Sequence, residues 1–259
     1  MNSYRESVVP IIREVREMVL PYFGNPGNVR HKDESGQNLV TELDEKVESF
    51  LSTRLRALYP TIEFVGEEGG GNRMAERFWL LDPIDGTSHF VRGLPFCTTM
   101  LALIDQGEVV FSVIYDFVRD EMYVAEKGMG ATKNGEKIFV SNRSLREAYM
   151  CYEIKQNTEN GKLVYQKLIE STFLFNSINA GFEYAMIASG RLDGRICFHP
   201  FGKDYDYAPG SLLVKEAGGI VTNIGSALYD YRDLDMIAVN PKIYKELTEG
   251  EHPLFPIQK

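Results

Sequence analysis

The feature that most constrains the fold is a series of apolar segments separated by short polar turns between residues 78 and 140. Residues 78–81 form one segment, two longer ones flank the turn at 105–108, and another covers 122–125. Short apolar segments bounded by glycine and charged turn residues predict strands, and the Asn-Gly pair at 134–135 predicts a hairpin. The sequence therefore predicts a mainly antiparallel sheet in the N-terminal half.

Two amphipathic helices are predicted before this sheet. Apolar residues recur at three- and four-residue spacing in residues 8–22 and again in 43–58, as expected of helices with one buried face. The short strands predicted at 62–65 and 78–81 each run directly into a Gly-rich acidic loop. Acidic side chains are therefore expected at strand ends.

After residue 146, strand and helix patterns alternate. Strands are predicted at 149–154, 195–198, 220–222 and 236–239, and helices at 162–169, 182–188, 206–217 and after the Asn-Pro pair at 240–241. No repeat, low-complexity tract or linker separates the two halves. We therefore predict one compact unit over 1–259, with subdomains of about 1–146 and 147–259 and a cleft between them as the natural place for a site.

Charge and composition restrict the partners and the location that we expect. The chain has 28 Lys and Arg against 37 Asp and Glu, a net charge of −9, which would repel a nucleic acid, so no nucleic-acid partner is expected. No apolar segment approaches the roughly 20 residues of a membrane span, and the N-terminal residues lack the pattern of a secretion signal. Three cysteines, Cys97, Cys151 and Cys197, form no CxxC pair, which argues against disulfides and zinc. We therefore expect a cytoplasmic protein with no membrane partner.

The segment Asp-Pro-Ile-Asp-Gly-Thr at residues 82–87 carries the strongest chemical signal. Because Pro83 has no N–H and a fixed φ, we expect the chain to leave the strand there, with Asp82 and Asp85 facing one point. Gly86 permits close backbone approach, and the amides of Gly86 and Thr87 would point at an anion if a helix begins there. Two carboxylates and a carbonyl on one turn offer oxygen ligands to a hard cation such as magnesium. An isolated Asp-Gly turn usually has no such role, so the rest of the chain must support this interpretation.

Three further carboxylates are candidates, and each has an ordinary structural alternative. Glu67 follows a predicted strand in the loop 66–71, where a solvated acidic loop is equally expected. Asp206 stands where a helix begins, as a plain N-cap would. Asp44 has capping-box spacing from Thr41 at the start of the second helix.

Taken together, these segments resemble the inositol monophosphatase family. The resemblance rests on Thr41 with Asp44 and Glu48, on Gly66-Glu67-Glu68, on Trp-Leu-Leu-Asp-Pro-Ile-Asp-Gly-Thr at 79–87, and on Asp206 ten residues before Glu216-Ala217-Gly218-Gly219. It covers essentially the whole chain, in order. It implies an α+β or α/β fold, a layered αβαβα sandwich with a mainly antiparallel N-terminal sheet and a mixed C-terminal sheet, and a homodimer.

The resemblance also implies an enzyme. Family members bind two or three Mg²⁺ ions, hydrolyse small phosphate monoesters by direct attack of water, and are sensitive to lithium. Transferred to matching positions, the implied metal ligands are Glu67, Asp82, the carbonyl of Ile84, Asp85 and Asp206. Thr87 would help to orient the attacking water, with Glu67 and Asp44 in support. Gly86 and Thr87 would also contact the phosphate.

The residues expected to contact the rest of the substrate match the family less well. Lys32 stands where the family often has a loop lysine near the site, although an exposed hairpin lysine is an equal alternative. In inositol-specific members a glutamate that bonds ring hydroxyls follows the Leu-Asp-Gly sequence, and Cys197 stands there in this chain. Asn179 occupies the position of a family serine or threonine and could bond a substrate hydroxyl. Lys203, in a stretch about two residues longer than in the family, would suit a second phosphate or a carboxylate.

The predicted function is therefore Mg²⁺-dependent hydrolysis of a small phosphorylated metabolite, with inositol-1-phosphate as the leading substrate. Fructose 1,6-bisphosphate, NADP, adenosine 3′,5′-bisphosphate and histidinol phosphate are the alternatives within the family. A regulatory binding protein that retains the fold is the alternative from another class, because family members also act in transcription complexes.

Overall fold

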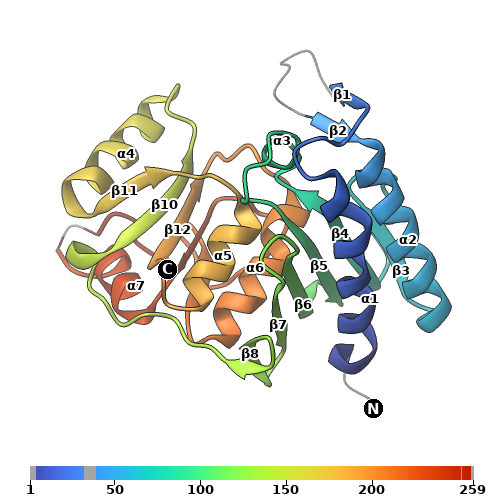
Figure 1. Cartoon of the computed structure of the whole chain (residues 1–259). Helices are drawn as coiled ribbons and strands as arrows, with labels where there is room; N and C mark the ends of the chain where they lie inside the picture. The colour runs from blue at the N-terminus through green and yellow to red at the C-terminus, as the bar shows by residue number, and fades with distance from the viewer. Residues whose placement is uncertain (1–3, 32–38, 252, 258–259) are drawn as a thin grey trace.

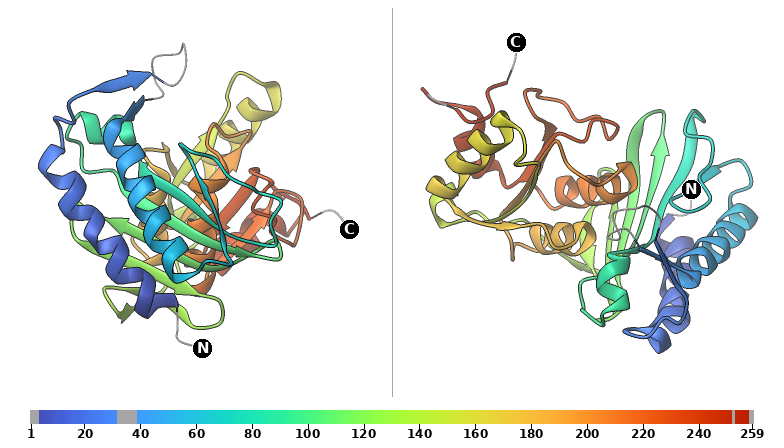
Figure 2. Two further views of the ribbon diagram at one scale, coloured as in Figure 1. Left: turned by 90° about the vertical axis from the view of Figure 1, so that its right-hand side faces the viewer. Right: turned by 90° about the horizontal axis from the view of Figure 1, so that it is seen from above.

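The computed structural model describes residues 4–31, 39–251 and 253–257. Helices and sheets alternate in five layers, which are seen edge-on in the view from above (Figures 1 and 2). The order is a helix pair, a seven-stranded sheet, a second helix pair, a five-stranded sheet and a third helix pair. The predicted αβαβα sandwich is confirmed.

The first two layers contain the N-terminal helices and the larger sheet. Helices α1 (Tyr4–Val19) and α2 (Glu42–Leu58) bury one apolar face each against it. The strands, in spatial order, are β3 (Glu63–Gly66), β4 (Arg77–Asp85), β5 (Thr98–Asp105), β6 (Glu108–Asp116), β7 (Glu121–Glu126), β8 (Gly130–Lys133) and β9 (Glu136–Lys137). Only the β3–β4 pair is parallel, so this sheet is mainly antiparallel, as predicted.

The central layer consists of α5 (Ala180–Ala188) and α6 (Asp204–Glu216), which both sheets cover. Because both faces of these helices are covered, long stretches of consecutive residues are buried, 184–188 in α5 and 207–214 in α6, and neither helix has the single apolar stripe of a surface helix. The two helices approach closely at Gly210, where an added Cβ would lie 2.0 Å from the ring of Tyr184. This close packing in the central layer fixes the first turns of α5 and α6 relative to both sheets.

The second sheet is mixed. Its strands, in spatial order, are β11 (Phe173–Asn176), β10 (Tyr149–Ile154), β12 (Gly194–Phe198), β14 (Met236–Val239) and β13 (Ile220–Asn223). Strand β10 runs parallel to β11 and β12, whereas the pairs formed by β14 are antiparallel. Helices α4 (Glu159–Ser171) and α7 (Pro241–Thr248) cover its outer face.

Several short elements were not predicted. They are β1 (Val29–His31), β2 (Leu39–Thr41), β11 and the 3₁₀ turns Leu20–Tyr22 and Leu145–Glu147. The short helix α3 (Thr87–Val91) begins directly after Gly86, where the sequence suggested that a helix could start. Strand β1 is exposed and β11 is an edge strand, so neither has the alternation of a half-buried strand. Helix α6 packs on strands of both sheets and so connects the two halves of the chain. The division into two subdomains stays a prediction. In the described part of the chain, no helix combines the length and apolar character needed to cross a bilayer.

Candidate metal and phosphate site

Three aspartates from two elements meet at one end of the larger sheet. Asp82 and Asp85 of β4 and Asp206 of α6 each present a carboxylate oxygen, and these oxygens all lie within 4.8 Å of one another. They line a cavity of about 570 Å³ between the two sheets. Glu67 lines the same cavity because β3 pairs in parallel with β4, so both strands end at one edge. The structure thus brings four of the predicted metal ligands together.

An irregularity in β4 allows both of its aspartates to face the cavity. Residues three apart on a regular strand point to opposite faces. The pairing of β4 with β5 shifts register between Asp82 and Asp85, which changes that alternation. The expectation that the chain leaves the strand at Pro83 is therefore wrong. The strand continues to Asp85. At the shift in register, residue 83 does not need to donate a backbone N–H to β5, which proline could not do. The hydroxyl of Thr99 donates to the Pro83 carbonyl at 2.8 Å.

Asp85 is held from two sides. Its Oδ2 accepts hydrogen bonds from the Thr98 hydroxyl at 2.8 Å and from the backbone N–H of Gly181 at 2.7 Å. Gly181 lies in the first turn of α5, and a Cβ there would lie 2.1 Å from the Thr98 hydroxyl oxygen. The start of α5 thus reaches Asp85 only because this residue is glycine.

Burial leaves the aspartate cluster electrostatically unfavourable without a cation. Burial raises the pKa of Asp82 well above its usual value, and the charges of Glu67, Asp85 and Asp206 raise it further. Burial also raises the pKa of Asp85 to about 6, although the Thr98 and Gly181 hydrogen bonds oppose the shift. The pKa of Asp206 is raised by burial and by Asp85. Buried carboxylates of this kind are stabilised when a cation joins them.

One oxygen in the cluster is left without a partner. Oδ1 of Asp82 is buried and accepts no hydrogen bond from any described residue. Buried carboxylate oxygens normally have partners, so an orphaned one needs an explanation. A divalent cation bound by hard oxygen ligands supplies it, and the donor set fits Mg²⁺.

Asp206 combines helix capping with its place in the cluster. Lys203 is the N-cap of α6, and the Asp206 carboxylate accepts a hydrogen bond from the Lys203 backbone N–H at 2.5 Å. The sequence offered capping and metal binding as alternatives, whereas the structure makes them compatible. This hydrogen bond holds the carboxylate of Asp206 at the start of α6.

Asp44 and Thr87 form a pair beside the cluster. The Thr87 hydroxyl lies 2.9 Å from both Oδ1 of Asp44 and the Ile84 carbonyl, so its single proton can go to either acceptor. The other Asp44 oxygen accepts from the backbone N–H of Thr41 at 2.8 Å and from its hydroxyl at 2.6 Å. The buried Asp44 thus caps α2, as one alternative predicted, and also fixes the hydroxyl of Thr87.

The loop that carries Glu67 is clamped by a glutamate for which the sequence suggested no role. Glu48 is 8% exposed, and its carboxylate accepts the backbone N–H groups of Glu68 at 2.9 Å and Gly69 at 2.7 Å. The Tyr205 hydroxyl donates to Oε1 of Glu67 at 3.4 Å. These contacts fix the chain directly after Glu67 and one oxygen of its carboxylate.

The remaining predicted contacts have different places in the structure. Gly86 has φ +84°, and a Cβ there would lie 2.6 Å from both the Asn179 side-chain nitrogen and the Phe96 carbonyl. Asn179 lines the cavity, and its Oδ1 caps α5 by accepting from the Phe182 N–H at 2.9 Å. Lys203 lines the cavity with an exposed side chain. Lys32 lies outside the described residues.

The cavity also contains residues that the sequence did not single out as contacts. They are His89, Glu153, Ser177, Arg195, Phe201, Tyr205 and Tyr207. Cys197, by contrast, is completely buried. The pattern of β12 and the odd length of the following loop pointed to this region, but the strand that pairs with β12 could not be identified from sequence.

Buried and half-buried carboxylates lie beside an oriented threonine hydroxyl between two sheets, and this arrangement suits a divalent cation. The chain belongs to the inositol monophosphatase family, whose family model matches residues 2–252. It is 32% identical to a Nus factor SuhB from Pseudomonas aeruginosa over 88% of each chain. It is 29% identical to a fructose-1,6-bisphosphatase/inositol-1-monophosphatase from Thermotoga maritima over 93% of each chain. The solved structure of a Thermotoga maritima IMPase superposes with a TM-score of 0.82 at 30% identity over 92% of each chain.

Proposed function

We propose that this protein is a Mg²⁺-dependent phosphatase that hydrolyses small phosphate monoesters, with inositol-1-phosphate as the leading substrate. The observation that carries the proposal is the aspartate triplet with its orphaned Asp82 oxygen, next to the oriented hydroxyl of Thr87. The family of the chain supports it, because its members are phosphatases.

The metal would be held by the residues that surround the cluster. They are Glu67, Asp82, the Ile84 carbonyl, Asp85 and Asp206, and they would accommodate two or three ions. When bound there, Mg²⁺ supplies positive charge that stabilises the phosphoryl oxygens and the departing alkoxide.

The protein's own groups would orient the attacking water. Because the Thr87 proton is directed to Asp44 or to the Ile84 carbonyl, its oxygen presents lone pairs to a water in the cavity. Glu67 lines the same space and can accept a hydrogen bond from that water. The backbone amides of Gly86 and Thr87, at the start of α3, would contact the phosphate.

The alcohol side of the substrate would lie against the second sheet. Asn179 and Lys203 line the cavity there and offer an amide and an ammonium group. Lys155 lies nearby, with its Nζ 5.0 Å from the centre of the Phe201 ring. Lysines at this mouth favour a second candidate class, esters with a second phosphate such as fructose 1,6-bisphosphate or adenosine 3′,5′-bisphosphate. NADP and histidinol phosphate are the remaining candidate substrates.

A phosphate-release screen over these esters, with Mg²⁺ titrated, tests the proposal. We expect turnover that a chelator abolishes and Mg²⁺ restores, highest with inositol-1-phosphate. Background activity toward every ester, unchanged by chelator, would refute the phosphatase. Faster turnover of a bisphosphate would reassign the substrate and leave the chemistry in place.

A binding role independent of catalysis is a separate hypothesis, favoured by the relative named Nus factor SuhB. Its test is a pull-down with the wild type and with Asp85→Asn. A stoichiometric partner retained by the inactive variant would support it. The homodimer, lithium inhibition and cytoplasmic location stay predictions, which light scattering, inhibition assays and fractionation can check.

A further inference from the structure

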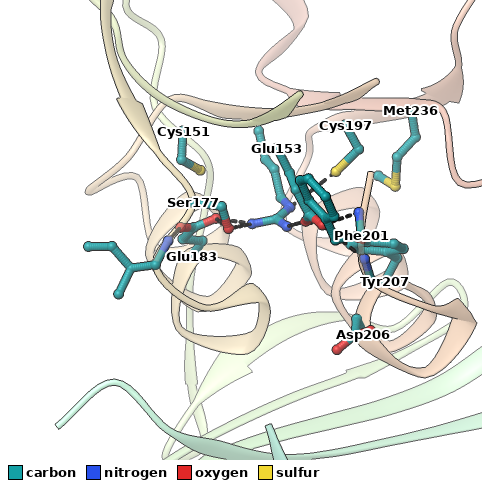
Figure 3. A network of polar contacts seen from close by, with 12 residues as sticks. Cys151, Glu153, Ser177, Glu183, Cys197, Phe201, Asp206, Tyr207 and Met236 are labelled. Carbon is teal, nitrogen blue, oxygen red and sulfur yellow. Dashed lines mark hydrogen bonds and ion pairs between the residues drawn. The ribbon is translucent and has the colours of Figure 1, made fainter. Parts of the chain in front are cut away.

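The second sheet forms one wall of the cavity. In this wall, a buried arginine lies between two glutamates. Arg195 of β12 is 1% exposed, and its guanidinium forms ion pairs with Glu153 of β10 and Glu183 of α5. It also donates to the hydroxyl of Ser177 at 2.8 Å and to the sulfur of Cys197 at 3.3 Å. Figure 3 shows Glu153 and Glu183 in this network, together with Ser177 and Cys197. Arg195, Glu153 and Glu183 are called the Arg195 unit below.

Glu153 ties the loop before α6 to the sheet. One of its oxygens accepts the backbone N–H groups of Phe201 at 2.7 Å and Gly202 at 2.9 Å. The other accepts from Arg195 and from the hydroxyl of Tyr207 at 2.9 Å (Figure 3). The loop held in this way continues directly into Lys203, the N-cap of α6, and so fixes the backbone that carries the Lys203 side chain.

Glu183 ties the loop before α5 in the same manner. One of its oxygens accepts the backbone N–H of Ile178 at 2.6 Å, and the other accepts from Arg195 and from the hydroxyl of Ser177 at 3.1 Å. This loop continues into Asn179. One buried cation therefore organises both loops on the alcohol side of the cavity.

The hydrogen bonds of Glu153 distinguish positioning from substrate binding. Glu153 is the register partner of Cys197, where inositol-specific relatives were expected to carry a hydroxyl-binding glutamate. A carboxylate offers about four lone-pair sites, and four donors already occupy those of Glu153. It therefore has no acceptor left for a substrate hydroxyl, although it lines the cavity.

Stability alone gives a weak reason for such a unit. Two glutamates and one arginine leave a surplus negative charge in a buried place, and buried ion pairs often stabilise no better than well-packed apolar side chains. Their best-attested benefit is to specify one arrangement. Here the specified arrangement is that of the two loops.

We propose that the Arg195 unit is a positioning device that determines substrate specificity, by fixing the loops 177–179 and 201–203 around the alcohol part of the ester. The proposal rests on the proposed phosphatase function for its kinetic test. The unit acts through Asn179 and Lys203, and it contacts no reacting atom.

The kinetic experiment compares Arg195→Lys with the wild type on two substrates. Lysine keeps the charge but is a compact point charge, so it cannot reach both glutamates, Ser177 and Cys197 in a fixed fork. We expect the KM for the best polyol or sugar phosphate to rise roughly tenfold with kcat changed little, because small misplacements of positioning groups are costly. Phenyl phosphate, which lacks hydroxyl groups on its alcohol part, should show almost no change in KM.

Arg143→Lys is the matched control. Arg143 pairs with the buried Asp193 at 2.8 Å and lies outside the residues that line the cavity. It should leave both KM values unchanged. Equal losses with the polyol ester and phenyl phosphate, or equal losses in both variants, would overturn the specificity role.

Hydrogen exchange gives a readout that needs no activity. The N–H groups of Phe201, Gly202 and Ile178 donate to the Arg195 unit, so their exchange should accelerate in Arg195→Lys, while those of β6 should not. Glu153→Gln should accelerate exchange in 201–202 alone. Unchanged exchange at all three amides in folded Arg195→Lys would overturn the proposal. A wild type without phosphatase activity would refute the proposed function and leave this second test decisive.

Discussion

The two walls of the cavity hold their carboxylates in opposite ways. On the β4 wall, Asp82 and Asp85 crowd against Asp206, and burial raises the pKa values of all three. On the opposite wall, the guanidinium of Arg195 lies between Glu153 of β10 and Glu183, which reaches it from α5 behind the cavity surface, and both glutamates accept several hydrogen bonds. In the described part of the chain the three aspartates form no ion pair, whereas the two glutamates share the charge of Arg195.

This difference separates two tasks. A carboxylate cluster that is unfavourable alone gains most from an added cation, so it suits metal binding. A carboxylate that already accepts hydrogen bonds at all its lone pairs cannot bind a ligand, but those bonds hold it in a fixed position. Changes on the β4 wall should therefore affect catalysis, and changes on the opposite wall should affect substrate selection.

The largest effect is expected from Asp85→Asn. The amide is nearly the same size but removes one negative charge, so we expect kcat/KM to fall by about 10³-fold or more at fixed Mg²⁺, on the scale of losing one electrostatic contact to the transition state. Initial rates of phosphate release over a range of substrate concentrations, at fixed Mg²⁺, measure it. Asp230→Asn, at an exposed surface pair with Arg232, is the control and should retain wild-type rates. Full activity in Asp85→Asn would contradict the assigned role of the β4 wall.

Thr87→Val should have the next largest effect. Valine matches threonine in shape but cannot orient a water, so we expect kcat to fall about 10²-fold with KM nearly constant. Thr87→Ser keeps the hydroxyl and should recover most of the rate. If valine raised KM and left kcat unchanged, Thr87 would be a substrate contact and the distinction between the two walls would weaken.

The two walls also differed in how well the sequence predicted them. The β4 wall is local: Asp82, Asp85 and Thr87 lie within one segment, and Asp44 and Asp206 stand at predicted helix starts. The family resemblance then identified these residues as a set. Most of the helices and strands were predictable for a similar reason, since long apolar segments and amphipathic patterns indicate which residues are buried. Their arrangement in five layers was implied by the family resemblance.

The opposite wall depends on pairing between distant segments. Glu153 approaches Arg195 only because β10 lies beside β12 in parallel register, and Glu183 joins them from a helix between the sheets. Each of these residues alone fits an ordinary surface position. The shift of register at Pro83 was likewise unpredictable, because it depends on how β5 pairs with β4.

A smaller effect is expected from Glu48→Gln. Its carboxylate accepts two backbone N–H groups beside Glu67, and the amide has only one oxygen to accept them. Groups that orient metal ligands typically contribute between about ten- and a hundredfold in metal affinity. Calorimetric titration with Mg²⁺ should show that loss. Glu14→Gln, which breaks an exposed pair with Arg54, should not. Unchanged affinity would mean that the Glu67 loop is fixed by other contacts.

The smallest effect concerns pH. The pKa of Asp85 in the folded protein is raised to about 6, above the value of about 4 expected when unfolded. Asp85 therefore binds its proton more tightly in the metal-free folded protein than in the unfolded chain. The free energy of unfolding of the metal-free protein should decrease as pH rises from about 4 through about 6. Asp82 and Asp206 are shifted in the same direction.

Magnesium must displace these protons, so its apparent affinity should fall up to about tenfold per pH unit below pH 6 for each proton displaced. The increase in Tm caused by a fixed Mg²⁺ concentration should accordingly be large at pH 8 and small at pH 5. Asp85→Asn removes one titrating group and should flatten this dependence. The Arg195→Lys variant, altered on the opposite wall, should keep the wild-type pH profile of Mg²⁺ stabilisation. An equal Tm increase at pH 5 and pH 8 in the wild type would show that the aspartates are ionised before the metal binds.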